Sequence, residues 1–412
     1  MEKPWVSPYW VSSWRNFACN RIHRFSYSKE VEFCDMTLES NGEAMPGISF
    51  EREEKFKIAL ALDEIGVQRI AVRAGFGKGF RPPSPREIGD YNALSRMGLN
   101  ARIVAFCGTV KEDIDRALSY DVPCAIVQNS CSDELMKAMG STHDQILNDA
   151  LESINYAKDH GLSVAYMPMD TTRARTGFLR RLLKAVKTKS KVDSVVVSDS
   201  VGCASPFGIF HLVEEVKREI EVPIELHCHD DFGMSTANSF SGIAAGATIV
   251  HTTVNGMGER AGLTALEEIA AALMVLRGIK TGIHFERLVE LSKLVGNLSN
   301  YPARRNKPIV GDLAMAVEVE SAVVSAKNLK KANYLQGDLP FLPEFVGNKF
   351  QVVLGAKTEE SGVKWALKEK GLLCPREKTQ LLVNEVESLA RRLKRPLTDE
   401  EFRELVKRTC SH

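Results

Sequence analysis

Short apolar runs rich in β-branched residues alternate along this chain with longer segments whose apolar positions recur at helical spacing. Strands that are buried on both faces of a parallel sheet read as near-continuous apolar runs, so these runs predict such strands. In one intervening helical segment, four apolar residues fall on one face: Ile209, Leu212, Val213 and Val216. The candidate strands span residues 31–37, 68–75, 101–108, 123–130, 162–168, 192–199, 223–229 and 248–256.

Eight strand–helix units between roughly residues 30 and 280 predict an α/β chain with a (β/α)8 TIM barrel. A doubly wound open sheet is the alternative, but no GxGxxG motif follows the first strand. The last segment contains a helix start, with Thr398 as N-cap and Glu401 three residues on. The predicted order is an irregular N-terminal segment at 1–30, the catalytic barrel at 31–305, an irregular linker subdomain at 306–360 and a C-terminal helical segment at 361–412.

The charge balance limits the kinds of partner that the chain can bind, and its cysteines indicate the redox compartment. Lys and Arg number 54 against 53 Asp and Glu, so no excess charge favours nucleic acid or an anionic membrane. No apolar run reaches membrane-spanning length, and the first residues lack the apolar core of a signal peptide. The nine cysteines form no CxxC pair, which predicts reduced thiols in a cytoplasmic protein that acts on small molecules.

The strongest local signal is the segment LHCHDD at the end of the seventh candidate strand. A strand's period of two points His227 and His229 to the same side, with Cys228 opposite. Two imidazoles that converge on a barrel mouth suit a divalent metal such as Zn, Mn or Fe. The alternative is two polar side chains that hydrogen-bond within the mouth, because an HxH pattern is short.

A longer segment carries a family resemblance. It reads HCHDDFGMSTANSFSGIAAGATIVHTTVNGMGERAGLTALEEI, and it closely resembles the strand-seven to helix-eight signature of the DRE-TIM metallolyase superfamily. Within that superfamily the chain is most similar to the isopropylmalate and homocitrate synthases. The resemblance covers residues 30 to about 360. Further matching segments are DMTL, SDELMKAMGST, MDTTRAR, SDSVGCASP and PIVGDLAMA.

This resemblance implies a metal-dependent Claisen-type reaction in which acetyl-CoA condenses with a 2-oxo acid and the thioester is hydrolysed. It also implies a divalent metal (Zn, Mn, Mg or Fe) and a homodimer in which the chain beyond residue 306 packs against the partner subunit. Chemically, a metal must grip the 2-oxo acid as a Lewis acid. A cation must hold the developing negative oxygen, and a base must take a proton from the thioester methyl group.

The chain departs from the family pattern at several of the positions that do this chemistry. Aligning GEAMPG with the family puts Asn41 where a metal-binding Asp belongs, and Glu39 or Ser40 where an Arg belongs. On the second strand Arg73 stands at the position of a Glu. The resemblance assigns the metal to His227, His229 and Asn41. Apolar residues replace polar ones at Met169, Leu263 and Val317.

Glu39 and Arg73 end neighbouring candidate strands, so the chain is predicted to carry the family's Arg–Glu pair with its charges reversed. In the functional interpretation, Arg73 supplies the cation and Glu39 becomes a ligand or base. In the structural interpretation, the two form an ion pair in a barrel mouth that no longer catalyses a reaction. Burying a neutralised pair there costs less free energy than burying a lone charge. We favour the functional interpretation, because loss of function usually leaves unpaired or apolar replacements and not a reversed pair. The apolar residues at Met169, Leu263 and Val317 favour the structural interpretation.

Other strand ends supply further candidates for the site. Asp170 and Arg173 follow the fifth strand as candidate catalytic residues, and the Arg suits a substrate carboxylate. The candidate substrate-binding residues are Asn129, Ser200, Glu259 and Arg260.

Three functions remain open at this point. The first is an acyl-transferring synthase with an altered acceptor. The second is a metal-dependent lyase or aldolase of the HMG-CoA lyase type, which needs no activation of acetyl-CoA. The third is a non-catalytic barrel that binds a partner molecule.

Overall fold

The computed structural model describes residues 6–18, 25–332 and 334–410, apart from the side chains of Ala18, Ser40 and Asn41. The chain divides into two compact units. One comprises residues 13–303, and the other joins residues 1–12 to residues 304–412.

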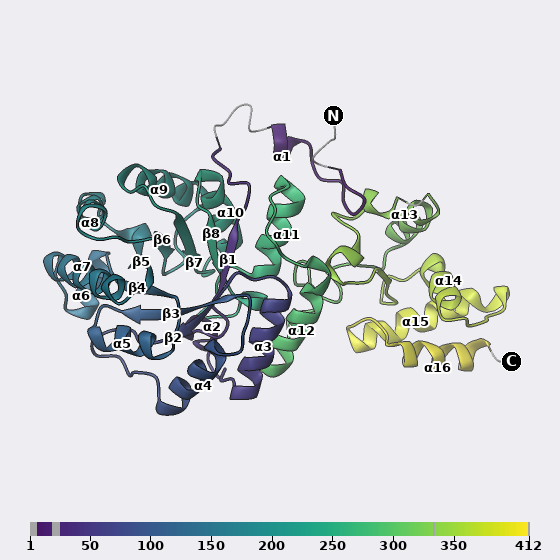
Figure 1. The fold of residues 1–412 in the computed structure, drawn as a ribbon. Helices are drawn as coiled ribbons and strands as arrows, with labels where there is room; N and C mark the ends of the chain where they lie inside the picture. The colour runs from purple at the N-terminus through teal and green to yellow at the C-terminus, as the bar shows by residue number, and fades with distance from the viewer. Residues whose placement is uncertain (1–5, 19–24, 333, 411–412) are drawn as a thin grey trace. The chain divides into compact units, whose positions relative to one another are not determined.

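The first unit is a closed barrel of eight parallel strands in sequence order, as predicted (Figure 1). The barrel closes between its first and last strands, where Cys34 lies opposite His251 and Asp35 opposite Thr252. The alternative of a doubly wound open sheet is therefore wrong. The strands are β1 (Glu32–Asp35), β2 (Arg69–Arg73), β3 (Arg102–Gly108), β4 (Cys124–Ser130), β5 (Ser163–Met169), β6 (Ser194–Asp199), β7 (Ile224–Cys228) and β8 (Ile249–Thr252).

Helices connect the strands around the outside of the barrel (Figure 1). Several begin with a side chain that caps the first turn. Ser84 forms a capping box with Glu87, and Thr142 forms one with Gln145. The helices of this unit are α1 (Arg15–Ala18), α2 (Ser40–Glu43), α3 (Arg52–Glu64), α4 (Pro85–Ser95), α5 (Lys111–Ser119), α6 (Asp133–Met139), α7 (His143–Asp159), α8 (Thr176–Lys189), α9 (Pro206–Glu219), α10 (Ser235–Ala245), α11 (Leu266–Arg277) and α12 (Leu288–Leu298).

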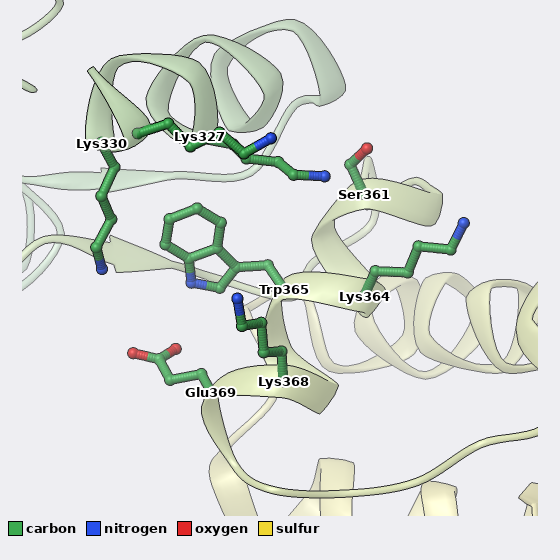
Figure 2. A pocket seen from close by; sticks show the side chains of 8 residues that line it. Lys327, Lys330, Ser361, Lys364, Trp365, Lys368 and Glu369 are labelled. Carbon is green, nitrogen blue, oxygen red and sulfur yellow. The ribbon is translucent and has the colours of Figure 1, made fainter. Parts of the chain in front are cut away.

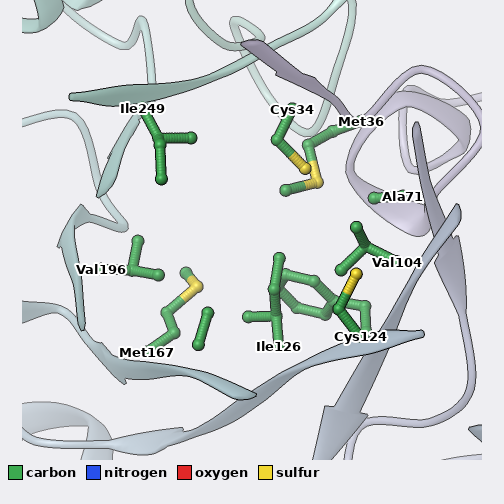
Figure 3. Close-up of a cluster of buried hydrophobic side chains, with 11 residues drawn as sticks. Cys34, Met36, Ala71, Val104, Cys124, Ile126, Met167, Val196 and Ile249 are labelled. Atoms are coloured by element: carbon green, nitrogen blue, oxygen red, sulfur yellow. The ribbon is translucent and has the colours of Figure 1, made fainter. Parts of the chain in front are cut away.

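Apolar side chains fill the interior of the barrel (Figure 3). Because successive residues of a strand face opposite sides, Cys34 and Met36 point inward while Asp35 points away. Met169, one of the apolar replacements, packs against this cluster at the end of β5. The buried members are Cys34, Met36, Ala71, Val104, Phe106, Cys124, Ile126, Ala165, Met167, Val196 and Ile249.

The second unit contains two parallel strands, β9 (Ala316–Val317) and β10 (Gln351–Val352), and four helices. These helices are α13 (Glu320–Lys331), α14 (Glu360–Glu369), α15 (Thr379–Leu393) and α16 (Asp399–Cys410). The predicted capping box at Thr398 is confirmed, since the two side chains and backbone amides of Thr398 and Glu401 bond reciprocally. The prediction that residues 306–360 are irregular is wrong over α13, where Val323 and Ala326 form a buried helical stripe.

The expectation that all nine cysteines are reduced thiols is also wrong. Cys374 and Cys410 form a disulfide across 36 residues of sequence. Helices α14, α15 and α16 pack around one apolar cluster, and this packing brings the two cysteines together. Their spacing in the sequence therefore did not indicate a disulfide. The other described cysteines are free: Cys34, Cys107, Cys124, Cys131 and Cys228 are buried, and Cys203 is exposed. Cys19 lies outside the described residues.

One further property concerns the helices of the described part of the chain. None of its helices is both long enough and apolar enough to cross a membrane.

Candidate active site at the barrel mouth

A line of polar side chains runs through the barrel beside the apolar cluster. Glu225 and His227 alternate with apolar residues on β7, so both face the interior, and His229 follows at the strand's end. His251 faces them from β8. Nε2 of His251 lies 2.8 Å from Oε2 of Glu225, and its Nδ1 lies 3.2 Å from Nδ1 of His227. Nε2 of His227 lies 3.3 Å from Nε2 of His229, so the four side chains form a continuous relay.

Glu225 anchors this relay as a buried carboxylate. Its Oε1 accepts hydrogen bonds from Arg69 at 3.0 Å and from Ser194 at 2.6 Å. Burial alone would raise its pKa, but the hydrogen bond from His251 and the nearby Arg69 charge lower the pKa of Glu225 to about 2. Glu225 is therefore ionised at neutral pH and can only accept hydrogen bonds.

The charge on Glu225 determines which nitrogen of each imidazole carries a proton. His251 must donate from Nε2 to the carboxylate, so in neutral His251 the Nδ1 atom is an acceptor. It then accepts the Nδ1 proton of His227, which leaves the lone pair of His227 Nε2 directed at His229. Burial and the charges of His229 and His251 lower the pKa of His227, which keeps this ring neutral.

The histidine pair fits a divalent metal as two of its ligands. Two nitrogens that each bind Zn²⁺ at about 2.1 Å in tetrahedral geometry lie about 3.4 Å apart. The observed separation of 3.3 Å agrees with this value. His229 Nδ1 is buried and has no hydrogen-bond partner among the described residues. Burial and the Arg260 charge lower the pKa of His229 to about 4, so both rings are neutral, as ligation requires.

The described residues supply no larger donor set. Within the described ranges, no three His, Cys, Asp or Glu side chains gather closely enough to hold a metal. The third predicted ligand, Asn41, belongs to α2, but its side chain lies outside the described part of the structure. Its role as a ligand stays a prediction.

Asp170, Arg173 and Ser200, all predicted from strand ends, lie together. Nη2 of Arg173 lies 2.6 Å from Oδ2 of buried Asp170, and the backbone N–H of Asp170 donates to Oγ of Ser200 at 2.8 Å. The hydroxyl of Ser132 also donates to the Asp170 carboxylate. Asp170 adopts a left-handed backbone with φ of 62°. Such strain persists where surrounding contacts hold it, and it is enriched at functional sites.

Arg260 continues this polar network. It donates to the carbonyl oxygen of Ser200 at 2.7 Å and forms ion pairs with Asp231 at 2.8 Å and with Glu259 at 3.1 Å. Its backbone is also left-handed, with φ of 60°. Five of the predicted residues, Asp170, Arg173, Ser200, Glu259 and Arg260, therefore lie in one connected array of hydrogen bonds and ion pairs.

Among the described residues, Arg73 contacts the segment that follows β2 and not the polar network above. It donates to the carbonyl oxygen of Arg81, and its guanidinium carbon lies 5.2 Å from the centre of the Phe76 ring. No contact between described residues joins it to Glu39, which is fully buried after β1. The predicted ion pair is not among the described contacts of Arg73. The Nε atom of Arg73 is buried without a hydrogen-bond partner among those residues.

Asn129 is bonded on both sides of its amide. Its oxygen accepts the Tyr166 hydroxyl at 2.8 Å, and its nitrogen donates to the carbonyl of Ile146 at 2.9 Å. These bonds link β4 to β5 and α7. This structural role explains Asn129 with no need for a contact to substrate. Leu263 is buried and pairs with His229 in an isolated β-bridge, so an apolar side chain borders the histidine pair.

Sequence reasoning missed Glu225 and His251. Glu225 precedes His227 by two residues, so the same alternation that paired the histidines also places it inside the barrel. His251 lies 24 residues after His227, and only the pairing of β7 with β8 reveals that the two are neighbours.

The chain is similar to known proteins over most of its length. Residues 30–295 match the family described as HMGL-like. The chain is 38% identical over 390 residues to homocitrate synthase AksA of Methanothermobacter thermautotrophicus, covering 94% of this chain and 96% of that one. It is 38% identical over 360 residues to a probable 2-isopropylmalate synthase of Methanopyrus kandleri, covering 87% of this chain and 70% of that one.

Solved structures show the same fold. An HMG-CoA lyase of Acinetobacter baumannii, solved with coenzyme A and 3-methylmalate, superposes with a TM-score of 0.59 at 17% identity. The match covers 70% of this chain and 95% of the lyase. The resemblance to the DRE-TIM metallolyases is confirmed, and the chain belongs to the HMGL-like family.

Proposed function

We propose that this chain is a metal-dependent acyltransferase that forms a C–C bond between the acyl group of acetyl-CoA and a 2-oxo acid. The observation that carries the proposal is the pair of neutral imidazoles held 3.3 Å apart at the barrel mouth. Relatives that are named synthases match almost the whole chain, which supports a condensation rather than a cleavage. We also expect a cytoplasmic homodimer.

In this proposal His227 and His229 hold the metal, with Asn41 as a third ligand. The bound metal supplies Lewis acidity to the carbonyl oxygen of the 2-oxo acid. Arg173 is pre-positioned by Asp170 and binds the acceptor carboxylate through its free guanidinium edge. Ser200 and Arg260 line the same array, where Glu259 restrains Arg260.

Glu39 and Arg73 divide the remaining chemistry. Glu39 takes the proton that leaves the acyl methyl group, and the resulting carbanion forms the new bond to the carbonyl carbon of the acceptor. The carbonyl electrons move to oxygen, and the guanidinium of Arg73 stabilises the alkoxide through its unused Nε–H. The proton held by Glu39 returns to the alkoxide, directly or through solvent, and water then hydrolyses the thioester to a carboxylate and free CoA.

The residues of the mouth also limit the kind of acceptor that it would take. Glu39 stands where the family's Arg would bind the acceptor, and a carboxylate would repel a second acidic group there. Leu263 borders His229 with an apolar side chain. We infer a 2-oxo acid with a single carboxylate and an apolar side chain.

Release of free thiol from acetyl-CoA tests the proposal. Protein is stripped with a chelator, reloaded with Zn²⁺, Mn²⁺ or Mg²⁺, and assayed against 2-oxo acids of increasing apolar length. Release that needs both metal and an acceptor supports the synthase, and His227→Ala should abolish it. Cleavage of a 3-hydroxyacyl-CoA without condensation would favour the lyase. The absence of both reactions, with no metal bound, would favour a non-catalytic binding protein.

A further inference from the structure

The second unit contains a pocket that the barrel chemistry does not use. Helices α13 and α14 border a cavity of about 560 Å³ (Figure 2). This volume falls within the range of about 300–1,000 Å³ that small-molecule sites occupy. Its lining residues are Lys327, Lys330, Lys331, Ser361, Lys364, Trp365, Lys368 and Glu369.

The lining is strongly basic. Five lysines against one glutamate leave a local charge of +4, whereas the whole chain carries +1. Among the described residues, only Lys364 of these five forms an ion pair, with Glu360 at 2.6 Å. Charge of this density in a concave pocket attracts an anion that carries several negative charges.

The spacing of these lysines places like charges beside one another on each helix. Lys327, Lys330 and Lys331 lie three and four residues apart on α13, so like charges face one another on one side of the helix. Such like-charge pairs destabilise an isolated helix. Lys364 and Lys368 repeat the arrangement on α14. Both helices therefore turn a repulsive face to the same cavity, and a bound polyanion would relieve the repulsion.

An aromatic plane stands among the charges. Figure 2 shows the Trp365 ring at the centre of the pocket with lysine side chains on several sides. Nζ of Lys330 lies 5.2 Å from the ring centre, and Phe350 braces the ring in an edge-on contact with the centroids 6.0 Å apart. A half-buried, braced indole in a polar pocket offers a stacking surface for a flat ring.

We propose that this pocket binds a nucleotide that carries two or more phosphates, with the base stacked on Trp365 and the phosphates held by the lysines. The lysine ammonium groups bind phosphate as point charges. A nucleotide combines the two features that the pocket combines, a flat aromatic ring and a compact cluster of negative charge. Free nucleotides and the nucleotide head of coenzyme A share this chemistry.

Calorimetric titration of the full-length protein tests the proposal and separates the two sources. The probes are ADP, ATP, adenosine 3′,5′-bisphosphate, coenzyme A, adenosine and inorganic tripolyphosphate. We expect the phosphorylated nucleotides to bind. Adenosine and tripolyphosphate should each bind about tenfold more weakly, because adenosine lacks the phosphates and tripolyphosphate lacks the base that stacks on Trp365. Tighter binding of ADP and ATP identifies a free nucleotide, and tighter binding of coenzyme A and the bisphosphate identifies the coenzyme head.

Variants of the pocket test each half of the recognition. Trp365→Leu should weaken nucleotides about tenfold and leave tripolyphosphate unchanged, whereas Trp365→Phe keeps an aromatic plane and should retain most of the affinity. Lys330→Glu with Lys368→Glu should weaken both classes by about tenfold or more. The matched control is Lys407→Glu, an exposed lysine on α16 outside the pocket, which should bind as the parent does.

Three results would overturn the proposal. The first is tripolyphosphate binding as tightly as ADP, which would leave Trp365 without a role. The second is an equal loss in Lys407→Glu, which would indicate unspecific charge. The third is capture by anionic phospholipid vesicles with no nucleotide binding, which would make the basic face a membrane contact. Because binding is measured without turnover, these outcomes are independent of whether the barrel condenses acyl groups.

Discussion

Nε2 of His251 lies 2.8 Å from Oε2 of Glu225, and this contact determines which nitrogen of neutral His227 carries the proton. The carboxylate requires a proton on Nε2 of His251, and neutral His251 in turn requires one on Nδ1 of His227. Partners of this kind outside the ligands orient a metal-binding imidazole and raise its basicity. Glu225 and His251 are therefore positioning residues for the histidine pair.

The first prediction concerns this relay. His251→Phe removes the acceptor for His227 Nδ1–H, while Arg69 and Ser194 still pair with Glu225. We expect the affinity for Zn²⁺ or Mn²⁺ to fall about tenfold to a hundredfold with the fold intact. Titration calorimetry measures the affinity, and circular dichroism checks the fold. His284→Phe alters an exposed histidine and should leave the affinity unchanged. Equal affinities in both variants would show that the relay does not orient His227.

A second prediction concerns Arg73. Arg73→Ala should lower kcat/KM for thiol release by about a hundredfold, because a fixed guanidinium near a developing oxyanion stabilises it by a few kcal/mol. Arg81→Ala is the matched control, since Arg73 donates to the Arg81 carbonyl, which that substitution keeps. The two variants are compared under identical metal loading. An unchanged rate in Arg73→Ala would make Arg73 a structural residue and would favour the binding-protein function.

The barrel was predictable because each strand is a local apolar run, and HxH alternation alone placed His227 and His229 on one face. Contacts that depend on closure of the barrel were not predictable in this way. His251 meets His227 only because β8 pairs with β7. In the same way, Ser200 joins Arg260 across 60 residues of sequence through a backbone carbonyl, which no side-chain motif encodes.

The Glu39–Arg73 pair shows the limit of reasoning from strand ends. Arg73 ends β2 as predicted, but β1 ends at Asp35 and Glu39 lies four residues beyond it. The order of residues along neighbouring strands also does not fix the direction of long side chains. Arg73 points to the loop after β2, where its guanidinium packs on Phe76 and donates to the carbonyl of Arg81. The arginine side chain is long enough to contact any of several partners, and the packing around it determines which one it contacts.

A third prediction concerns the disulfide between Cys374 and Cys410. Closing a loop of this length removes chain entropy from the unfolded state, which corresponds to about 3–4 kcal/mol. Reduction, or the double variant Cys374→Ser with Cys410→Ser, should therefore lower the melting temperature of the second unit. Differential scanning calorimetry with and without reductant measures the change. Cys203→Ser removes an exposed free thiol and should have no effect. Identical melting curves for oxidised and reduced protein would contradict a stabilising bond.

Asp35 is the basis of the last prediction. Its side chain is fully buried on the outer side of β1, where it accepts hydrogen bonds from the Thr37 backbone at 2.9 Å and the Thr252 hydroxyl at 3.4 Å. No cation is among the groups that shift its pKa, and the Glu267 carboxylate faces it as a like charge. Burial is the largest cause and raises the pKa of Asp35 to about 7, against 3.8 ordinarily.

Between these two pKa values the folded protein binds a proton that the unfolded chain has released, so stability falls as pH rises from about 4 to about 7. The full effect corresponds to about 4 kcal/mol, and it is complete above the folded pKa. Asp35→Asn keeps the amide oxygen as an acceptor for Thr37 and removes the charge. We therefore expect this variant to be more stable than the parent at pH 8 and similar to it at pH 4, in urea unfolding followed by circular dichroism. Asp144→Asn, at an exposed carboxylate, should follow the parent at both pH values. A constant difference between Asp35→Asn and the parent across this range would show that Asp35 is ionised throughout, and that Thr37 and Thr252 suffice to hold its charge.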